Sequence, residues 1–261
     1  MRMVDLSVPI SNRQKELGSK PGGIPEIEYF DHKQGAATMK QIFQCKDEDF
    51  PVHGEGWAVE EIFLTAHTGT HMDAPWHFGA ISEGKPAATI DQMPLEYGYS
   101  NGVVLNFSDF AEKHNTLKIG VADLQAELNR IGYQLQPLDI VLIYTGWDKK
   151  WGTSEYDKRP QPGMTRESTL WLIEAGVRLV GTDGFGWDVD FDTMRNEYIA
   201  TGNKDGLWEG HFAGLTRSYY QMEKLTNLNL LPSYGFKLSC FPIKIEKASA
   251  GWVRAVAILD E

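Results

Sequence analysis

Hydrophobic residues recur along the chain with two different periods, and these periods predict strands and helices. Residues 3–10 alternate apolar residues with polar or proline positions, as in a half-buried strand, and Pro9 favours a place near the edge of a sheet. Residues 57–65, 236–246 and 252–259 show strand-like patterns as well. We therefore expect strands at both ends of the chain and one in its first quarter.

A helical period governs the middle of the chain. The elements that it predicts are a helix at 121–131, a strand at 139–144, a helix at 167–175 and a strand at 177–181. Gly132 and Gly176 stand where these helices should end, and Thr165 is a suitable N-cap for the second helix. The alternation of helices with buried strands indicates a mixed α/β fold.

Residues 11–36 are rich in glycine, proline and charge, and we expect a long ordered excursion there. Ile24, Ile27, Tyr29 and Phe30 supply apolar side chains that such an excursion could bury. Because long ordered loops often carry binding surfaces, residues 11–56 are candidates for selecting a substrate.

Composition narrows the possible functions. The 261 residues are 42% hydrophobic and carry a formal net charge of −11 without a basic cluster, so nucleic acid and anionic membranes are unexpected partners. No apolar run is long enough for a membrane helix, and the first residues do not form a secretory signal. Cys45 and Cys240 form no metal or redox motif. We expect one domain over residues 1–261, located in the cytoplasm, that acts on a small molecule.

Residues 67–77, HTGTHMDAPWH, concentrate the chemistry of the chain. The candidate metal ligands in this stretch are His67, His71, Asp73 and His77. Pro75 and Gly69 argue against a continuous helix, so a strand end that runs into a tight turn is expected to bring the ligands together. Imidazole and carboxylate ligands suit zinc, manganese or iron, and three of them can leave a position open for water.

The same stretch resembles the His-x-Gly-Thr-His-x-Asp-x-Pro-x-His signature of the cyclase family of metal-dependent hydrolases, and every specified position matches. This family includes bacterial kynurenine formamidases and isatin hydrolases. The resemblance implies a swivelling β/β/α fold with a mixed, barrel-like sheet and flanking helices. It also implies a homodimer or a larger homo-oligomer.

The resemblance implies further site residues downstream. Family members carry a Gly-Thr-Asp after a strand lining the site, and Gly181, Thr182 and Asp183 match it. The glycines and aspartates that follow fit neither a dinucleotide nor a calcium motif. A His and a Glu twelve residues later complete the metal site of the formamidases, which His211 and Glu223 reproduce. In isatin hydrolases a Gln two residues before that Glu can bind the metal, and this is Gln221 here.

These residues lead to a mechanistic hypothesis. The predicted metal ligands are His67, His71, Asp73 and Gln221. The residues predicted to handle protons are His77, His211 and Glu223. The ion would activate a water and polarise an amide carbonyl, with manganese favoured slightly over zinc because of the oxygen ligands. The resemblance also allows a second ion at the last three residues, and the sequence leaves that choice open.

The expected substrate is a small aromatic cyclic amide. Trp57 and Trp76 are candidates for stacking on its ring, although large rings are as often simply buried. The chain is longer than compact kynurenine formamidases around residues 145–205, which favours opening of isatin to isatinate. Hydrolysis of N-formylkynurenine is the alternative, followed by other ring-opening or cyclase reactions on lactones or polyketides.

Two other classes of function are weighed against these. Gly98-Tyr-Ser-Asn-Gly102 matches the nucleophile elbow of serine hydrolases, but a strand-like run follows Ser100 where the elbow requires a helix. A turn into a strand is the ordinary interpretation. A metal-binding module without turnover is the second class, and the presence of proton-handling residues argues against it.

Overall fold

A computed structural model describes residues 1–12, 25–153, 155–156 and 160–260. The chain forms two compact units, one made of residues 1–9 with 66–261 and the other of residues 10–65. The prediction of a single domain over the whole chain stays a prediction. Ile24, which was expected to be buried, lies outside the described residues.

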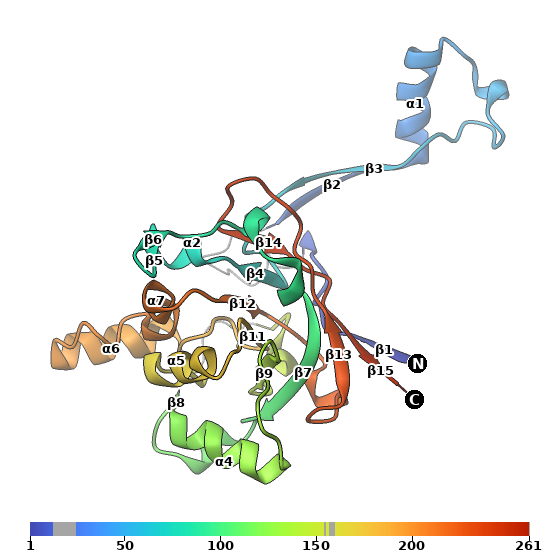
Figure 1. Cartoon of the computed structure of the whole chain (residues 1–261). Helices are drawn as coiled ribbons and strands as arrows, with labels where there is room; N and C mark the ends of the chain where they lie inside the picture. Colours follow the sequence, from blue (N-terminus) through green and yellow to red (C-terminus); the bar gives the residue numbers. More distant parts are fainter. Residues whose placement is uncertain (13–24, 154, 157–159, 261) are drawn as a thin grey trace. The chain divides into compact units, whose positions relative to one another are not determined.

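The first unit is built on a nine-stranded sheet that curls on itself (Figure 1). Its strands in spatial order are β1 (Arg2–Asp5), β15 (Val256–Leu259), β13 (Phe236–Ser239), β7 (Tyr99–Asn106), β9 (Ile140–Tyr144), β11 (Leu179–Thr182), β12 (Tyr220–Glu223), β4 (His71–Asp73) and β14 (Ala250–Trp252). The four strands from β7 to β12 are parallel, and the others pair antiparallel. The expected mixed, barrel-like sheet is confirmed.

Helices of the first unit connect and cover these strands (Figure 1). They are α2 (Pro75–Phe78), α3 (Phe110–Lys113), α4 (Val121–Ile131), α5 (Arg166–Glu174), α6 (Phe191–Thr201) and α7 (Glu209–Thr216). Short 3-10 turns lie at Ile90–Gln92, Leu95–Tyr97, Trp147–Lys150 and Leu228–Leu230. Two small ladders join β8 (Lys118–Ile119) to β10 (Gly163–Met164) and β5 (Ile81–Ser82) to β6 (Lys85–Pro86).

Two hydrophobic clusters lie on opposite faces of the sheet. In β9, Val141 and Ile143 pack with Leu124 of α4 and Leu172 of α5 on one face. The alternate residues of β9 belong to the other cluster, which the curled sheet encloses with its own side chains. Because both faces are covered, all five residues of β9 are buried, as expected for a central parallel strand.

Local signals set the helix boundaries that the sequence predicts. α4 ends at Gly132, which adopts the left-handed conformation that glycine tolerates. The Thr165 side chain accepts a hydrogen bond from the Ser168 amide and caps α5. The strand predicted at 3–10 ends already at Asp5, but β1 does lie at the sheet edge. Ser100 lies within β7, opposite Leu238, so the ordinary interpretation of that motif is confirmed.

The second unit is a hairpin with one helix. β2 (Glu26–Phe30) pairs antiparallel with β3 (Val59–Phe63), and α1 (His32–Phe43) and a 3-10 turn at Asp47–Asp49 lie between them in sequence. The expectation that residues 11–36 bury their apolar side chains is wrong for Tyr29, which is 59% exposed. A two-stranded hairpin has no second layer to cover it.

Within the described part of the chain, no helix combines the length and apolar character needed to cross a bilayer. Neither cysteine forms a disulfide. Cys240 is buried, whereas Cys45 is partly exposed.

Candidate metal centre

The histidine-rich stretch folds as a turn, a strand and a short helix. His67 lies in a turn where Gly69 has a φ of +63°, β4 carries His71 and Asp73, and Pro75 begins α2, which places His77. The prediction that no continuous helix spans these residues is confirmed. β3 comes before this turn in the sequence, as expected of a strand end that runs into a tight turn, and the second short strand and the helical turn after it were not predicted.

Strand pairing brings the downstream residues to the same place. β12 pairs antiparallel with β4 so that Gln221 lies opposite Asp73 and Glu223 opposite His71. Since alternate residues of a strand share a face, these four side chains project from one side of the sheet. His211 is supplied by α7, and its Nε2 lies 3.4 Å from Glu223 Oε1.

Asp73 is at the centre of the cluster. Its Oδ1 lies 2.8 Å from His67 Nδ1 and 3.2 Å from His71 Nε2. Its Oδ2 lies 4.0 Å from His77 Nε2 and 3.9 Å from His211 Nε2. The structure therefore brings together all seven residues that the sequence assigned to metal binding or proton transfer.

The cluster has the features of a cation site. Asp73 is fully buried, yet no described residue donates a hydrogen bond to Oδ1 even though two imidazole nitrogens lie near it. The geometry defines two groups of possible ligands that share Asp73, one with His67 and His77 and the other with His71 and Glu223. A buried, unpaired carboxylate oxygen is costly, and a cation would remove that cost.

Hydrogen bonds from outside the cluster orient two of the imidazoles. His71 Nδ1 donates to the Gly69 carbonyl at 2.9 Å, which directs Nε2 at Asp73. The other ring nitrogen of His67 is hydrogen-bonded to the Ser249 hydroxyl at 3.0 Å, which leaves Nδ1 toward the cluster. Both arrangements suit metal ligands.

Gln221 presents its amide nitrogen to the cluster. Its Nε2 lies 3.2 Å from Asp73 Oδ2 and 2.9 Å from Glu223 Oε1, which are two acceptors, and 2.7 Å from His211 Nε2, which is itself a donor when the imidazole is protonated. Its Oε1 faces the Tyr219 hydroxyl, whose single proton is also directed at the Gly210 carbonyl. Rotation of the amide would let Nε2 donate to Tyr219 and turn Oε1 to the cluster, so Gln221 as a metal ligand stays a prediction.

Burial and the neighbouring imidazoles have opposite effects on the pKa values of the two carboxylates in the cluster. Burial disfavours ionisation of Asp73, but the imidazoles of His71 and His67 hold the pKa of Asp73 well below its usual range. Burial and the charge of Asp73 also oppose ionisation of Glu223, yet His211 and His71 lower the pKa of Glu223. Both groups are therefore anionic at neutral pH, as metal ligands must be.

The two outer histidines are in opposite electrostatic environments. Burial lowers the pKa of His77 to about 4, so its imidazole is neutral. Burial also disfavours a charge on His211, but its hydrogen bond to Asp188 and the nearby Glu223 raise the pKa of His211 to about 10. The side chain of His77 is 26% exposed, whereas that of His211 is only 4% exposed. The cluster therefore meets solvent on the side of His77.

Asp188 is a site residue that the sequence did not reveal. Its carboxylate contacts His211 Nδ1 and also accepts hydrogen bonds from the Gly210 and His211 amides. The sequence signal was present, because Asp188 belongs to the aspartate-rich run after Asp183, but that run was considered only for a calcium loop. Ser249 could not have been found, since 182 residues separate it from His67.

The remaining predicted residues lie outside the cluster. Trp76 is 44% exposed on α2 beside His77, and Trp57 belongs to the second unit, where its ring meets Phe43 edge-on. Their contact with a substrate stays a prediction. Asp183 supports the end of β11 rather than the cluster, accepting hydrogen bonds from the amide and hydroxyl of Thr145.

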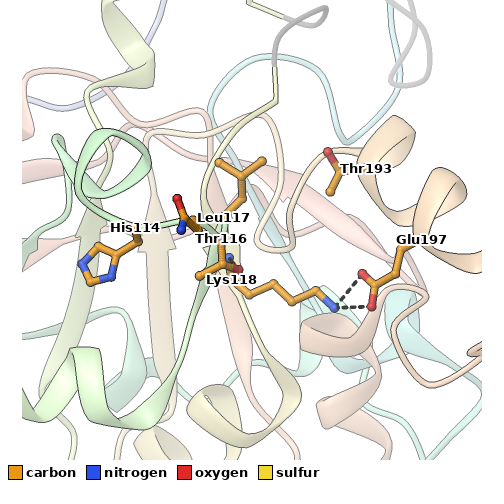
Figure 2. A pocket seen from close by; sticks show the side chains of 7 residues that line it. His114, Thr116, Leu117, Lys118, Thr193 and Glu197 are labelled. Atoms are coloured by element: carbon orange, nitrogen blue, oxygen red, sulfur yellow. Dashed lines mark hydrogen bonds and ion pairs between the residues drawn. The ribbon is translucent and has the colours of Figure 1, made fainter. Parts of the chain in front are cut away.

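A separate hollow of about 410 Å³ lies beside the Lys118–Glu197 ion pair (Figure 2). Its lining residues are His114, Asn115, Thr116, Leu117, Lys118, Thr193 and Glu197. The Lys118 ammonium contacts Glu197 at 2.9 Å and Glu209 at 3.0 Å, so its charge is already balanced. Lys118 is thus already paired with two carboxylates, and among the described residues the candidate metal ligands are concentrated in the cluster around Asp73.

The curled α/β sheet carries a buried cluster of His, Asp, Gln and Glu side chains of the kind that can hold a metal ion. Comparison with known families then identifies the family to which the chain belongs. A family model described as "Putative cyclase" matches residues 4–189, and the chain belongs to this cyclase family. The match contains the whole stretch from His67 to His77, whereas His211, Gln221 and Glu223 lie beyond it.

Individual relatives agree with this assignment. The chain is 24% identical over 225 residues to an isatin hydrolase of Roseibium aggregatum, covering 82% of this chain and 78% of that protein. It is 32% identical over 125 residues to a kynurenine formamidase of Geobacillus thermodenitrificans, covering 48% and 50%. An isatin hydrolase structure from Ralstonia solanacearum superposes with a TM-score of 0.75 at 24% identity, covering 99% of this chain and 92% of that one.

Proposed function

We propose that this protein is a metal-dependent hydrolase that opens a cyclic amide, and that isatin, opened to isatinate, is its substrate. The observation that carries the proposal is the set of seven ligand and proton-handling side chains around the unpaired Oδ1 of Asp73. The likeness to isatin hydrolases over almost the whole chain supports the choice of substrate.

The residues that would hold the ion are His67, His71, Asp73 and, after rotation of its amide, Gln221. When bound there, a divalent cation lowers the pKa of a water molecule and polarises the amide carbonyl. Two nitrogen and two oxygen ligands form a harder set than a thiolate site, so manganese is favoured slightly over zinc.

The outer residues of the cluster divide the movement of protons. His77 lies on the solvent side and has its Nε2 4.0 Å from Asp73 Oδ2, so it is placed to take a proton from the attacking water. As the new C–O bond forms and the ring C–N bond breaks, the departing nitrogen needs a proton. His211, which Asp188 orients, and Glu223 are placed to return it.

A site with two ions is the main variant of this proposal. A second ion would be bound by His77, His211 and Glu223, which would then be ligands rather than proton carriers. The two ligand groups that share Asp73 support this variant, because one contains His77 and the other Glu223. The number of ions retained per chain, measured by elemental analysis, separates these alternatives.

N-formylkynurenine is the second candidate substrate. The 32% identity to a kynurenine formamidase over about half of the chain favours it specifically. Both candidates contain a planar aromatic ring that Trp57 or Trp76 could stack upon, and both release nitrogen from an acyl carbon. Ring opening or closure of a lactone or polyketide remains the third.

The test is to strip the protein with a chelator, restore manganese or zinc separately, and assay isatin and N-formylkynurenine side by side. We expect turnover of isatin that depends on the added metal and is greater with manganese. Turnover of the formamide alone would favour the second candidate. Activity that survives chelation would contradict metal dependence.

We also propose a homo-oligomer, at least a dimer, in the cytoplasm. Exposed apolar side chains on the second unit support self-association, among them Tyr29, Ile62 and Phe63. Two cysteines that are not in disulfides are consistent with a reducing compartment.

A further inference from the structure

Trp208 occupies a backbone position that does not suit it. It is the N-cap residue of α7 and has φ 55° and ψ 37°, in the left-handed region. Serine, threonine, aspartate, asparagine and glycine are preferred at N-caps, and a bulky residue with positive φ is an outlier. Its side chain makes no capping hydrogen bond.

The capping role is fulfilled from elsewhere in the chain. Asp188 Oδ1 accepts a hydrogen bond from the Gly210 amide at 2.6 Å, and Oδ2 accepts one from the His211 amide at 3.2 Å. These are the amides that a normal N-cap side chain would satisfy. The residue at position 208 therefore does not need to cap α7, and its side chain can have another role.

The indole of Trp208 packs against both outer histidines of the cluster, whose own ring centroids lie 5.9 Å apart. It stacks on the His211 imidazole with ring centroids 4.2 Å apart and an angle of 16° between the planes. It also meets the His77 ring edge-on at 5.2 Å and 81°. His211 Nδ1 donates a hydrogen bond to Asp188, and the Phe78 ring meets the imidazole edge-on at 5.5 Å. These contacts leave the ring able to tilt, and the stacked indole restricts that tilt.

We propose that Trp208 is a positioning residue that holds the His211 imidazole, and the edge of His77, in the orientation required for proton transfer. The expected effect on kcat rests on the proposed function, whereas the stacking of Trp208 on His211 does not. Backbone strain of this kind is retained at sites where function requires it. A stacked indole holds the His211 ring in place without adding a group that titrates.

The experiment compares Trp208→Asn, which suits the left-handed N-cap but has no ring, with Trp208→Phe, which keeps an aromatic face. With manganese-loaded protein and isatin, we expect Trp208→Asn to lower kcat about 100-fold with little change in KM, since small misplacements of catalytic groups have effects of this size. Trp208→Phe should restore most of kcat. Trp171→Asn on α5 is the control for loss of a half-buried indole, and it should lower Tm without lowering kcat.

A second measurement needs neither metal nor turnover. In protein labelled with ¹⁵N-histidine, the His211 Nδ1 proton shared with Asp188 should be protected from exchange in the wild type and in Trp208→Phe. It should broaden beyond detection in Trp208→Asn. If that signal and kcat are both unchanged in Trp208→Asn, the inference is wrong. If the wild type turns over neither substrate while the signal behaves as expected, the proposed function fails and the positioning role stands.

Discussion

The two units differ in which side chains lack a suitable environment: buried polar groups in one unit and exposed apolar groups in the other. The sheet unit buries polar groups that lack full compensation, with Asp73 Oδ1 unpaired at the centre of its histidines. The unit of residues 10–65 exposes apolar groups instead, and within α1 only Gly35 and Ala36 are buried. A cation would compensate an unpaired buried charge, whereas another protein surface would remove an exposed apolar surface from water. The first unit therefore supports the proposed metal chemistry, and the second supports the proposed self-association.

Removal of Asp73 tests the first half of this comparison and has the largest expected effect. Asp73→Ala should abolish metal retention and turnover together, because both ligand groups contain this carboxylate. His77→Ala should reduce turnover far more than metal content if one ion is bound. Elemental analysis of the two purified variants beside the wild type decides between the alternatives, and equal loss of metal in both would favour two ions.

A second buried carboxylate of the sheet unit, that of Asp183, should make the stability of the protein depend on pH. Burial raises the pKa of Asp183 to about 6, partly offset by its hydrogen bonds from Thr145. The folded state therefore binds this proton more tightly than the unfolded state, so the free energy of unfolding should fall as pH rises from about 4 to about 6. The contribution is up to about 3 kcal/mol. Denaturant titrations at several pH values should show this decline in the wild type and a smaller one in Asp183→Asn.

A charge on the hairpin tests the second half of the comparison. Phe63 is 78% exposed, and Phe63→Glu should weaken self-association about 30-fold, the effect of losing about 2 kcal/mol at an interface. Light scattering across a dilution series measures the mass. Leu95→Lys in the sheet unit, where Leu95 is 71% exposed, is the matched control and should leave the mass unchanged. Equal masses for wild type and Phe63→Glu at every concentration would leave the exposed apolar surface unexplained.

The smallest expected effect is that of Ser100→Ala. Ser100 is paired within β7 opposite Leu238 and lies in no nucleophile elbow, so kcat should stay at the wild-type value. Rate measurements before and after treatment with a serine-directed reagent check this. A loss of activity in either experiment would restore the serine hydrolase alternative.

Prediction from sequence succeeded where local signals and burial agreed. The helix at 121–131 and the cap at Thr165 were found because an apolar stripe faced the sheet and the end signals were unambiguous. α1 was missed, although Asp31 and Gln34 form a capping box there. It begins in a segment interpreted as a long excursion because of its glycine, proline and charge, and α1 itself buries only Gly35 and Ala36.

The sequence by itself determined the composition of the candidate metal centre. The spacing from His67 to His77 supplied ligands of the right chemistry within eleven residues, and the resemblance to formamidases and isatin hydrolases added His211, Gln221 and Glu223. Only the tertiary structure decided how they meet, because strand register places Gln221 opposite Asp73 and a helix from another part of the chain brings His211. It also added Asp188, Ser249 and Trp208, whose contacts with the histidines depend on packing rather than on any local pattern.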